Sequence, residues 1–563
     1  MKNINKWIFA SFCVITLASC SESFLVRDPY GDTITQGQYE KMANQLEGSL
    51  RGIYSMMYNV TDHDEFGKRS IDMYTDIMCG DLALTNHIYG WFYSDELLQG
   101  QTGRTGYIWY YYYRMLHNVN AVLYAAQGGG TASADNVIKR IAANGLPNTV
   151  KTVNSEYVYY NIVGTDTLAT YTEEEANIAY YYAQALALRG YIYSNLVMLY
   201  TPTSRYVSNF NTELTFPLYT ENNMDYAQPL ATLTEVYAQL ESDLTNAIDY
   251  FDAFNKIDRS SKLMIDGTLA RAFLAYSYLN KGATNGHGDT FNNAYTNALK
   301  YAQEAITNAQ TKESCSILSR RDLLTTGFND VNNTSWMWGQ NVTVETAGGL
   351  ASFFGQVDIH SYSYAWAGDT KAIDENLYKE IPDFDARKLW FNDGKANSTY
   401  KYCPDGKFFS ASNPKSTKAD DIDREWLSDN VYMRIESMYL IASEASFRLG
   451  KDDDAISYLT AITDERIAEG MDAEYATWKS GLTHANLLAA IEYNWRVELW
   501  GEGYGLQTFR RLTPETLSTK ERRRGANHDG TPGAKIESKD YIFPMPSSET
   551  SYNPAVKNTT KLP

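Results

Sequence analysis

Two acidic side chains in the last quarter of the chain have a spacing that hydrolytic chemistry could use. Glu498 and Glu502 are four residues apart and share one face if the segment is helical. Glycosidases use two carboxyl groups about 5 to 9.5 Å apart, one of them protonated. Arginines flank the pair (Arg434 in an earlier block, Arg496 beside it), and they would keep both acids ionised. We therefore interpret the pair as structural.

Other catalytic and metal-binding signatures are absent from the sequence. The chain contains no HExxH, no GxSxG elbow, no P-loop and no paired metal spacing. Asp452, Asp453 and Asp454 suit the first turn of a helix and lack the alternate spacing of a calcium loop. The histidines are scattered, and each reads as a surface or structural residue: His63, His87, His117, His287, His360, His484 and His528. We expect a binding protein without a catalytic residue, cofactor or metal ligand.

Cys20 could carry a covalent lipid. Residues 1–6 include two lysines, and residues 7–17 form an apolar run of eleven. Such a helix rises roughly 16 Å, too short to span a bilayer, so we interpret it as a signal peptide. Residues 17–20 look like a bacterial lipobox, which implies cleavage after Ser19 and lipidation of Cys20. An ordinary signal peptide with a chance cysteine is the alternative.

The remaining composition fits an extracytoplasmic protein at a membrane surface. Loss of residues 1–19 would leave 544 residues and change the net charge from −19 to about −21. This acidity argues against nucleic acid and against anionic lipid as partners. Cys79, Cys315 and Cys403 show neither disulfide nor zinc spacing and should be free, buried thiols.

Apolar periodicity predicts a mainly α-helical domain at residues 36–563, preceded by a lipidated tether at 20–35. Helix pairs at 439–466 and 269–306 are rich in alanine, as in tetratricopeptide repeats; two ordinary helical hairpins are the alternative. The stretch 128–172, with a β-like run at 157–163, and a loop-rich insertion around 327–430 interrupt the helices. The predicted helices are 35–57, 108–126, 173–200, 232–251, 264–281, 291–308, 431–449, 452–469 and 484–500.

Several blocks, in order along nearly the whole mature chain, resemble the SusD/RagB family of outer-membrane nutrient-binding lipoproteins. The most specific is the block at 432–445, followed by Gly501-Glu502-Gly503. The chain departs from the family pattern at Gly505 and Thr508, where arginine and aspartate are frequent. The other matching blocks are 23–29, 109–120, 183–200, 216–248, 381–388 and 542–554.

The resemblance implies a single SusD-like fold whose long loops carry the binding surface. It also implies an outer-membrane lipoprotein that faces the exterior and acts as a hinged lid on a SusC-like TonB-dependent transporter. The ligand would be an oligosaccharide, with a peptide as the alternative within the family. A secreted lipoprotein glycoside hydrolase and a tetratricopeptide-like scaffold that binds only proteins are alternatives from other classes.

The candidate ligand-binding residues are aromatic side chains in loops. Sugars bind by stacking on aromatic faces, and the chain is rich in them, with 45 Tyr, 21 Phe and 11 Trp. Clusters at 89–93 and 362–366 lie where SusD-like proteins place ligand-binding aromatics. We expect ligand contacts from Trp91 and Trp366, then from Tyr93 and Tyr364. The alternative for each tryptophan is a core residue that covers a helix seam.

Overall fold

The computed structural model describes residues 36–93, 103–129, 136–257, 261–282, 289–325, 327–408, 428–516, 522–537 and 541–556. Cys20, the predicted signal peptide and the tether lie outside these ranges. The described helices are α2 (Gln36–Met56), α3 (Lys68–Met78), α4 (Gly103–Ala126), α5 (Val137–Asn144), α6 (Glu173–Tyr200), α7 (Leu233–Ala253), α8 (Gly267–Lys281), α9 (Asp289–Lys312), α10 (Phe353–Val357), α11 (Glu375–Glu380), α12 (Ile435–Arg448), α13 (Asp452–Thr463), α14 (Asp472–Ser480), α15 (His484–Glu498), α16 (Gly505–Thr516) and α17 (Ser547–Tyr552).

Small antiparallel sheets accompany the helices, so the mainly α-helical prediction is confirmed. The pairs are β1 with β8, β5 with β6, β7 with β9 and β10 with β11, and β2, β3 and β4 form a three-stranded sheet. The strands are β1 (Leu82–Leu84), β2 (Thr149–Val153), β3 (Glu156–Val163), β4 (Asp166–Tyr171), β5 (Leu214–Pro217), β6 (Leu230–Thr232), β7 (Trp336–Gln340), β8 (Lys371–Ile373), β9 (Asn430–Arg434), β10 (Arg522–Arg523) and β11 (Lys535–Ile536).

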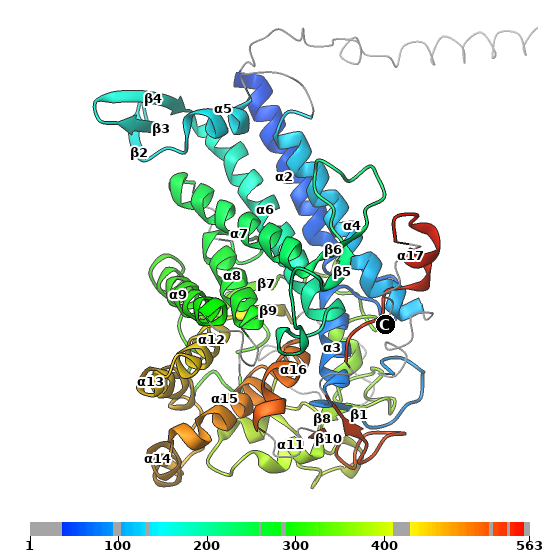
Figure 1. The fold of residues 1–563 in the computed structure, drawn as a ribbon. Coiled ribbons are helices and arrows are strands. Elements are labelled where there is room, and N and C mark those ends of the chain that lie inside the picture. Colours follow the sequence, from blue (N-terminus) through cyan, green and yellow to red (C-terminus); the bar gives the residue numbers. More distant parts are fainter. Residues whose placement is uncertain are drawn as a thin grey trace, which may run out of the picture.

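Helix α6 runs through the middle of the upper part of the molecule, where it contacts α2, α4 and α7 (Figure 1). It begins as predicted, because Thr172 and Glu175 form a capping box. Arg189 on α6 forms an ion pair with Asp243 on α7 at 2.7 Å, and both side chains are buried. Gly190 permits this close approach, since a Cβ there would lie 2.5 Å from Cγ of Leu244.

Successive helices pack as pairs down the molecule. Helix α7 contacts α8, α8 contacts α9, α9 contacts α12, and α12 contacts α13 (Figure 1). The predicted pairs at 269–306 and 439–466 therefore form α8 with α9 and α12 with α13. Gly450 follows α12 with φ of 71°, a left-handed conformation that ends a helix and that glycine adopts without a steric penalty.

Two segments of the chain form strands beside the helices. The predicted helix at 431–449 is wrong at its start, because residues 431–434 belong to β9, which pairs with β7, and the helix begins at Ile435. The β-like run at 157–163 is confirmed as part of β3. The sheet β2–β3–β4 projects from one end of the molecule (Figure 1).

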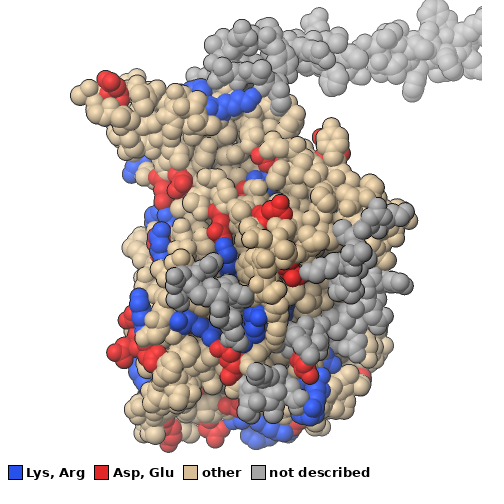
Figure 2. Space-filling model, viewed as in Figure 1, with Lys and Arg blue, Asp and Glu red and all other residues tan. Residues whose placement is uncertain are grey.

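Buried hydrophobic residues form one cluster that includes side chains from Ala43 to Phe543. Cys79, Cys315 and Cys403 are free and buried, as predicted. Within the described ranges, no helix has the length and apolarity to cross a bilayer. One face of the molecule shows Lys and Arg interspersed with Asp and Glu rather than a field of one sign (Figure 2).

Candidate functional site

The pairing of β1 with β8 brings the two predicted aromatic clusters together. Leu84 at the end of β1 lies opposite Lys371 at the start of β8. The pairing continues for one more residue, where the backbone N–H of Thr85 donates to the carbonyl of Thr370 at 2.9 Å. In an antiparallel pair, the segment after β1 and the segment before β8 leave the same end of the ladder. Residues 85–93 and 358–370 are therefore neighbours.

Buried polar contacts fix these loops to each other. The carboxylate of Asp369 accepts a hydrogen bond from the backbone N–H of Ile88 at 3.0 Å and pairs with buried Lys371. Lys371 also donates to Gln356 at 2.8 Å, and Gln356 donates to the backbone carbonyl of His63 at 2.9 Å. Burial lowers the pKa of Lys371, and Asp369 opposes this effect. The network therefore links three segments that are distant in sequence.

Four rings form the aromatic platform, which we define as His63, Tyr89, Trp91 and Tyr364. Tyr89 and His63 both stack on Trp91, with centroid distances of 4.9 and 5.0 Å and interplanar angles of 19° and 24°. Tyr364 meets Trp91 edge-on at 4.6 Å. Its hydroxyl lies 2.6 Å from Nδ1 of His63. Burial raises the pKa of Tyr364, and neighbouring Tyr89 adds to the rise.

The rings of the platform differ in their exposure to solvent. Trp91 is half-buried because two rings stack on it, whereas Tyr89 is 43% exposed and His63 is also exposed. Backbone geometry supports this placement, since Gly90 and Phe92 have φ of 78° and 60°. The Phe92 side chain is buried against Tyr74, with centroids 4.6 Å apart, and so anchors the loop beneath the platform.

The four predicted residues are distributed over three adjacent groups. Trp91 and Tyr364 meet in the platform. Trp366 lies instead against Tyr362, with a centroid distance of 5.6 Å, and Tyr362 is 51% exposed. Tyr93 stacks on His87 at 5.0 Å.

Three exposed rings were missing from the prediction. Tyr89 and Tyr362 belong to the two clusters that the sequence singled out, so loop position alone could have indicated them. His63 lies in a separate turn, and its spacing from either cluster contains no signal of contact.

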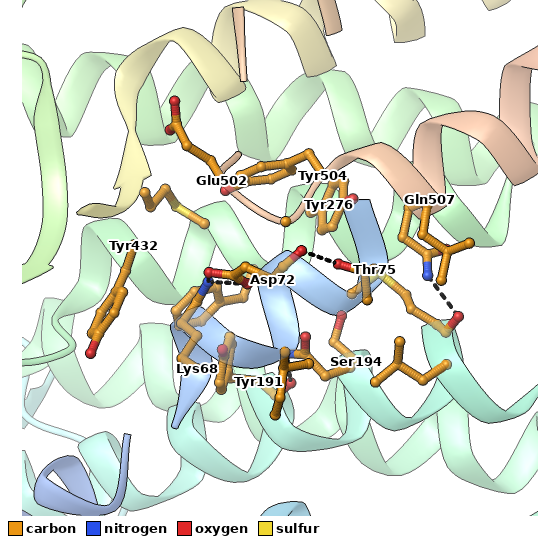
Figure 3. Close-up of a pocket in the computed structure, with 18 of the residues that line it drawn as sticks. Lys68, Asp72, Thr75, Tyr191, Ser194, Tyr276, Tyr432, Glu502, Tyr504 and Gln507 are labelled. Carbon is orange, nitrogen blue, oxygen red and sulfur yellow. Dashed lines mark hydrogen bonds and ion pairs between the residues drawn. The ribbon is translucent and has the colours of Figure 1, made fainter. Parts of the chain in front are cut away.

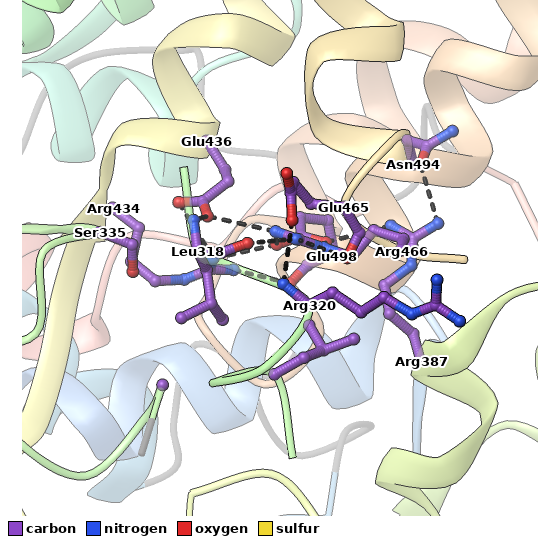
Figure 4. A network of polar contacts seen from close by, with 12 residues as sticks. Leu318, Arg320, Ser335, Arg387, Arg434, Glu436, Glu465, Arg466, Asn494 and Glu498 are labelled. Carbon is purple, nitrogen blue, oxygen red and sulfur yellow. Dashed lines mark hydrogen bonds and ion pairs between the residues drawn. The ribbon is translucent and has the colours of Figure 1, made fainter. Parts of the chain in front are cut away.

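Glu498, the first residue of the acidic pair, lies in a buried network of charged side chains (Figure 4). Glu498 contacts Arg434 at 2.9 Å, Arg466 at 2.8 Å and Arg387 at 3.1 Å. Burial alone would raise the pKa of Glu498, but Arg466, Arg434 and Arg387 together hold it well below its usual range.

Glu502 is ionised for the same reason. Its carboxylate contacts Arg434 at 2.9 Å and Lys407 at 2.8 Å. Burial opposes ionisation, yet these two cations lower the pKa of Glu502. Neither Glu498 nor Glu502 therefore supplies the protonated acid that glycoside hydrolysis requires.

The family pattern often has arginine where this chain has Gly505, and Asp76 on α3 accounts for the glycine. The Asp76 carboxylate accepts backbone hydrogen bonds from Gly503 at 3.1 Å and Gly505 at 3.0 Å. A Cβ at Gly505 would lie 2.7 Å from Oδ1 of Asp76, so a longer side chain would displace it. A carboxylate from another helix thus fills this position.

An internal cavity of about 70 Å³ lies between α3, α6 and the segment that leads into α16 (Figure 3). Lys68 and Asp72 form an ion pair at its wall, at 2.8 Å. Gln507 donates to the carbonyl of Met198 at 2.6 Å. This volume suits one or a few ordered water molecules rather than a nutrient.

Comparisons with known proteins agree with the fold. The SusD family model (SusD_RagB) matches residues 274–561, about half of the chain. A SusD-like carbohydrate binding protein from Bacteroides vulgatus has 21% identity and a TM-score of 0.64, with 92% of this chain and 98% of that chain covered. A SusD superfamily protein from Bacteroides thetaiotaomicron has 18% identity and a TM-score of 0.65, with 91% and 98% covered. No curated protein matches the sequence.

The two solved structures share the overall fold, and the family match includes the buried charge network of Arg434, Glu498 and Glu502. The resemblance that the sequence blocks indicated is therefore confirmed. This chain belongs to the SusD family.

Proposed function

We propose that this protein captures an oligosaccharide at the cell surface through the aromatic platform. The supporting observation is the convergence of two loops on exposed rings, held by β1–β8 pairing and by the Asp369–Lys371 contact. Stacked and edge-on rings present broad apolar faces beside polar atoms, which is the chemistry that a sugar ring requires. A similar protein in Bacteroides vulgatus is described as carbohydrate binding, which supports the same ligand class.

Within this proposal, ligand contact is shared among rings of different exposure. Tyr89 and Tyr362 are exposed and offer open faces. Trp91 and Tyr364 contact Tyr89, whereas Trp366 contacts Tyr362. Trp366 and Tyr93 lie beside the platform and can extend contact along a longer chain of sugars. We therefore retain Trp91, Tyr93, Tyr364 and Trp366 as proposed ligand-binding residues and add Tyr89.

Delivery and anchoring form the second part of the proposal. Lipidated Cys20 would hold the protein at the exterior face of the outer membrane, with residues 20–35 as the tether. A SusC-like TonB-dependent transporter would then receive the captured ligand beneath a hinged lid formed by the domain at 36–563. This part rests on the lipobox-like sequence and on family membership.

Peptide binding remains the alternative within the family, because tyrosine faces also accept peptide side chains. Hydrolysis has less support, since the paired acids that suggested it are ionised and buried among arginines. A scaffold that binds only proteins would leave the platform without a small ligand.

A glycan and peptide binding screen on the full-length protein separates these functions. Our proposal expects glycans to bind intact, without release of shorter products. Binding of peptides alone, or appearance of hydrolysis products, would contradict it. Cys20→Ala tests anchoring: we expect a folded protein that no longer supports growth on the native glycan, and normal growth would contradict the anchored receptor.

A further inference from the structure

A second cavity lies between α14, α15 and residues 380–387. Its volume is about 330 Å³, at the lower end of the range for small-molecule sites. Neither the buried charge network around Glu498 nor the sequence blocks that resemble the SusD family assign a function to this cavity. The aromatic platform contributes none of its lining residues.

Three aromatic side chains line one part of this cavity. Phe384, Tyr475 and Trp478 are in mutual contact, with centroid distances of 5.7 to 5.9 Å. Phe384 and Trp478 are half-buried and so lie near the opening, whereas Tyr475 is buried. Because the three rings contact one another, they form one continuous aromatic wall.

The inner polar groups already have partners. Arg387 donates to Asp385 at 2.6 Å and to Asn494 at 2.9 Å, and the hydroxyl of Tyr493 donates to Asp385 at 2.7 Å (Figure 4 shows Arg387 and Asn494). Arg387 is buried and also contacts Glu498. These guanidinium donors are thus committed within the protein and offer no site for an anionic ligand.

The opening of the cavity carries an acceptor. The side chain of Glu380 is 57% exposed, and its ion pair with Arg496 is long, at 3.5 Å. A carboxylate can accept hydrogen bonds from ligand hydroxyl groups and repels ligand carboxylates. An aromatic wall with an acceptor at its rim matches a ring that has C–H faces and hydroxyl donors.

We propose that this cavity is a second carbohydrate site, which takes one or two neutral sugar rings against Trp478 and Phe384 with hydroxyl groups directed to Glu380. The ligand class rests on the proposed function, whereas the location is independent of the platform. Such a site would let the protein hold the end of a glycan, or a free sugar, separately from the chain on the platform.

Saturation-transfer NMR and calorimetry on the full-length protein test the proposal. The probes are glucose, galactose, mannose, N-acetylglucosamine and their disaccharides, with glucuronic acid as the charged counterpart of glucose and indole as an apolar probe. We expect at least one neutral sugar to bind. Trp478→Ala should weaken it about tenfold, and Trp478→Phe should retain most of the affinity, on the scale of aromatic stacking.

Two further variants separate this site from the platform. Trp91→Ala should leave binding in the second cavity unchanged, and Glu380→Gln should reduce the preference for glucose over glucuronic acid. The second site is rejected if no neutral sugar binds, if Trp478→Ala has no effect, or if indole alone binds. Trp91→Ala tests only the aromatic platform, and Trp478→Ala tests only the second cavity. The proposed function and the second site can therefore fail independently of each other.

Discussion

The hydroxyl oxygen of Tyr364 lies 2.6 Å from Nδ1 of His63, although 301 residues separate them in the sequence. The contact joins the turn after α2 to the loop before β8, and Gln356 makes a second link by donating to the carbonyl of His63. Because both residues also contact Trp91, the hydrogen bond fixes the geometry of the whole platform.

Removing only this hydroxyl should have a modest effect. We expect Tyr364→Phe to weaken oligosaccharide binding about two- to tenfold, because one hydrogen bond contributes about 0.5–1.5 kcal/mol. Tyr364→Ala, which also removes the ring, should weaken binding more. Calorimetric titration of both variants provides the measurement, and equal affinities for Tyr364→Phe and Tyr364→Ala would show that the ring itself contributes nothing.

Loss of a platform ring should reduce affinity strongly. We expect Trp91→Ala and Tyr89→Ala each to cost about 1–3 kcal/mol of binding free energy, borrowing the scale of base–aromatic stacking. Tyr226→Ala is the matched control, since Tyr226 is exposed but lies outside the platform and its flanking ring pairs. A control variant that loses as much affinity as Trp91→Ala would place the binding surface elsewhere.

The buried charge network should be intolerant of neutralisation. Glu498→Gln removes a negative charge that contacts Arg434, Arg466 and Arg387 in a buried site, and we expect a loss of about 3–5 kcal/mol in the free energy of unfolding. Urea denaturation measures the loss. Glu469→Gln, at an exposed position, should change stability little, and similar stabilities for both variants would refute the structural role of Glu498.

Asp76 should make stability depend on pH. Burial raises its pKa to about 7 from an ordinary value of 3.8, and Asp72 and Asp81 add to the rise against hydrogen bonds from Gly503 and Gly505. Between these values the folded protein holds a proton that the unfolded chain has released. The free energy of unfolding should therefore fall as pH rises from about 4 to about 7.

Asp76→Asn cannot ionise, so it should lack this part of the pH dependence. We expect the two profiles to diverge by an amount on the order of 4 kcal/mol between the ends of that range, since each pKa unit corresponds to about 1.4 kcal/mol. Urea denaturation at several pH values provides the comparison, with Asp472→Asn as an exposed control. Parallel profiles for the wild type and Asp76→Asn would contradict a raised pKa.

The sequence predicted those elements whose signals are local. The capping residues Thr172 and Glu175 mark the start of α6, and alanine-rich periodicity marks α8, α9 and α12. Helix α3 was not among the predicted helices, although its apolar residues Ile71, Tyr74, Ile77 and Met78 recur every three or four positions. Tertiary packing also buries its polar residues, including Lys68 and Asp76, and no local pattern indicates that burial.

The site could be predicted only as separate pieces. Loop aromatics identified the clusters at 89–93 and 362–366, but their contact depends on β1 and β8, which are three residues long and too short for a period-two pattern. The partners of Trp366 and Tyr93 depend on the same loop packing. No local pattern could connect His63 with Tyr364, since that contact results from tertiary packing.

The central claim is that the aromatic platform binds a glycan for uptake. Its most direct test is a calorimetric titration, with the glycan selected by the binding screen, of the wild type and a triple variant with Tyr89→Ala, Trp91→Ala and Tyr364→Ala. We predict that the wild type binds the glycan and that the folded triple variant keeps only the binding that depends on Trp478 in the second cavity. Equal affinity in the two proteins would contradict the account.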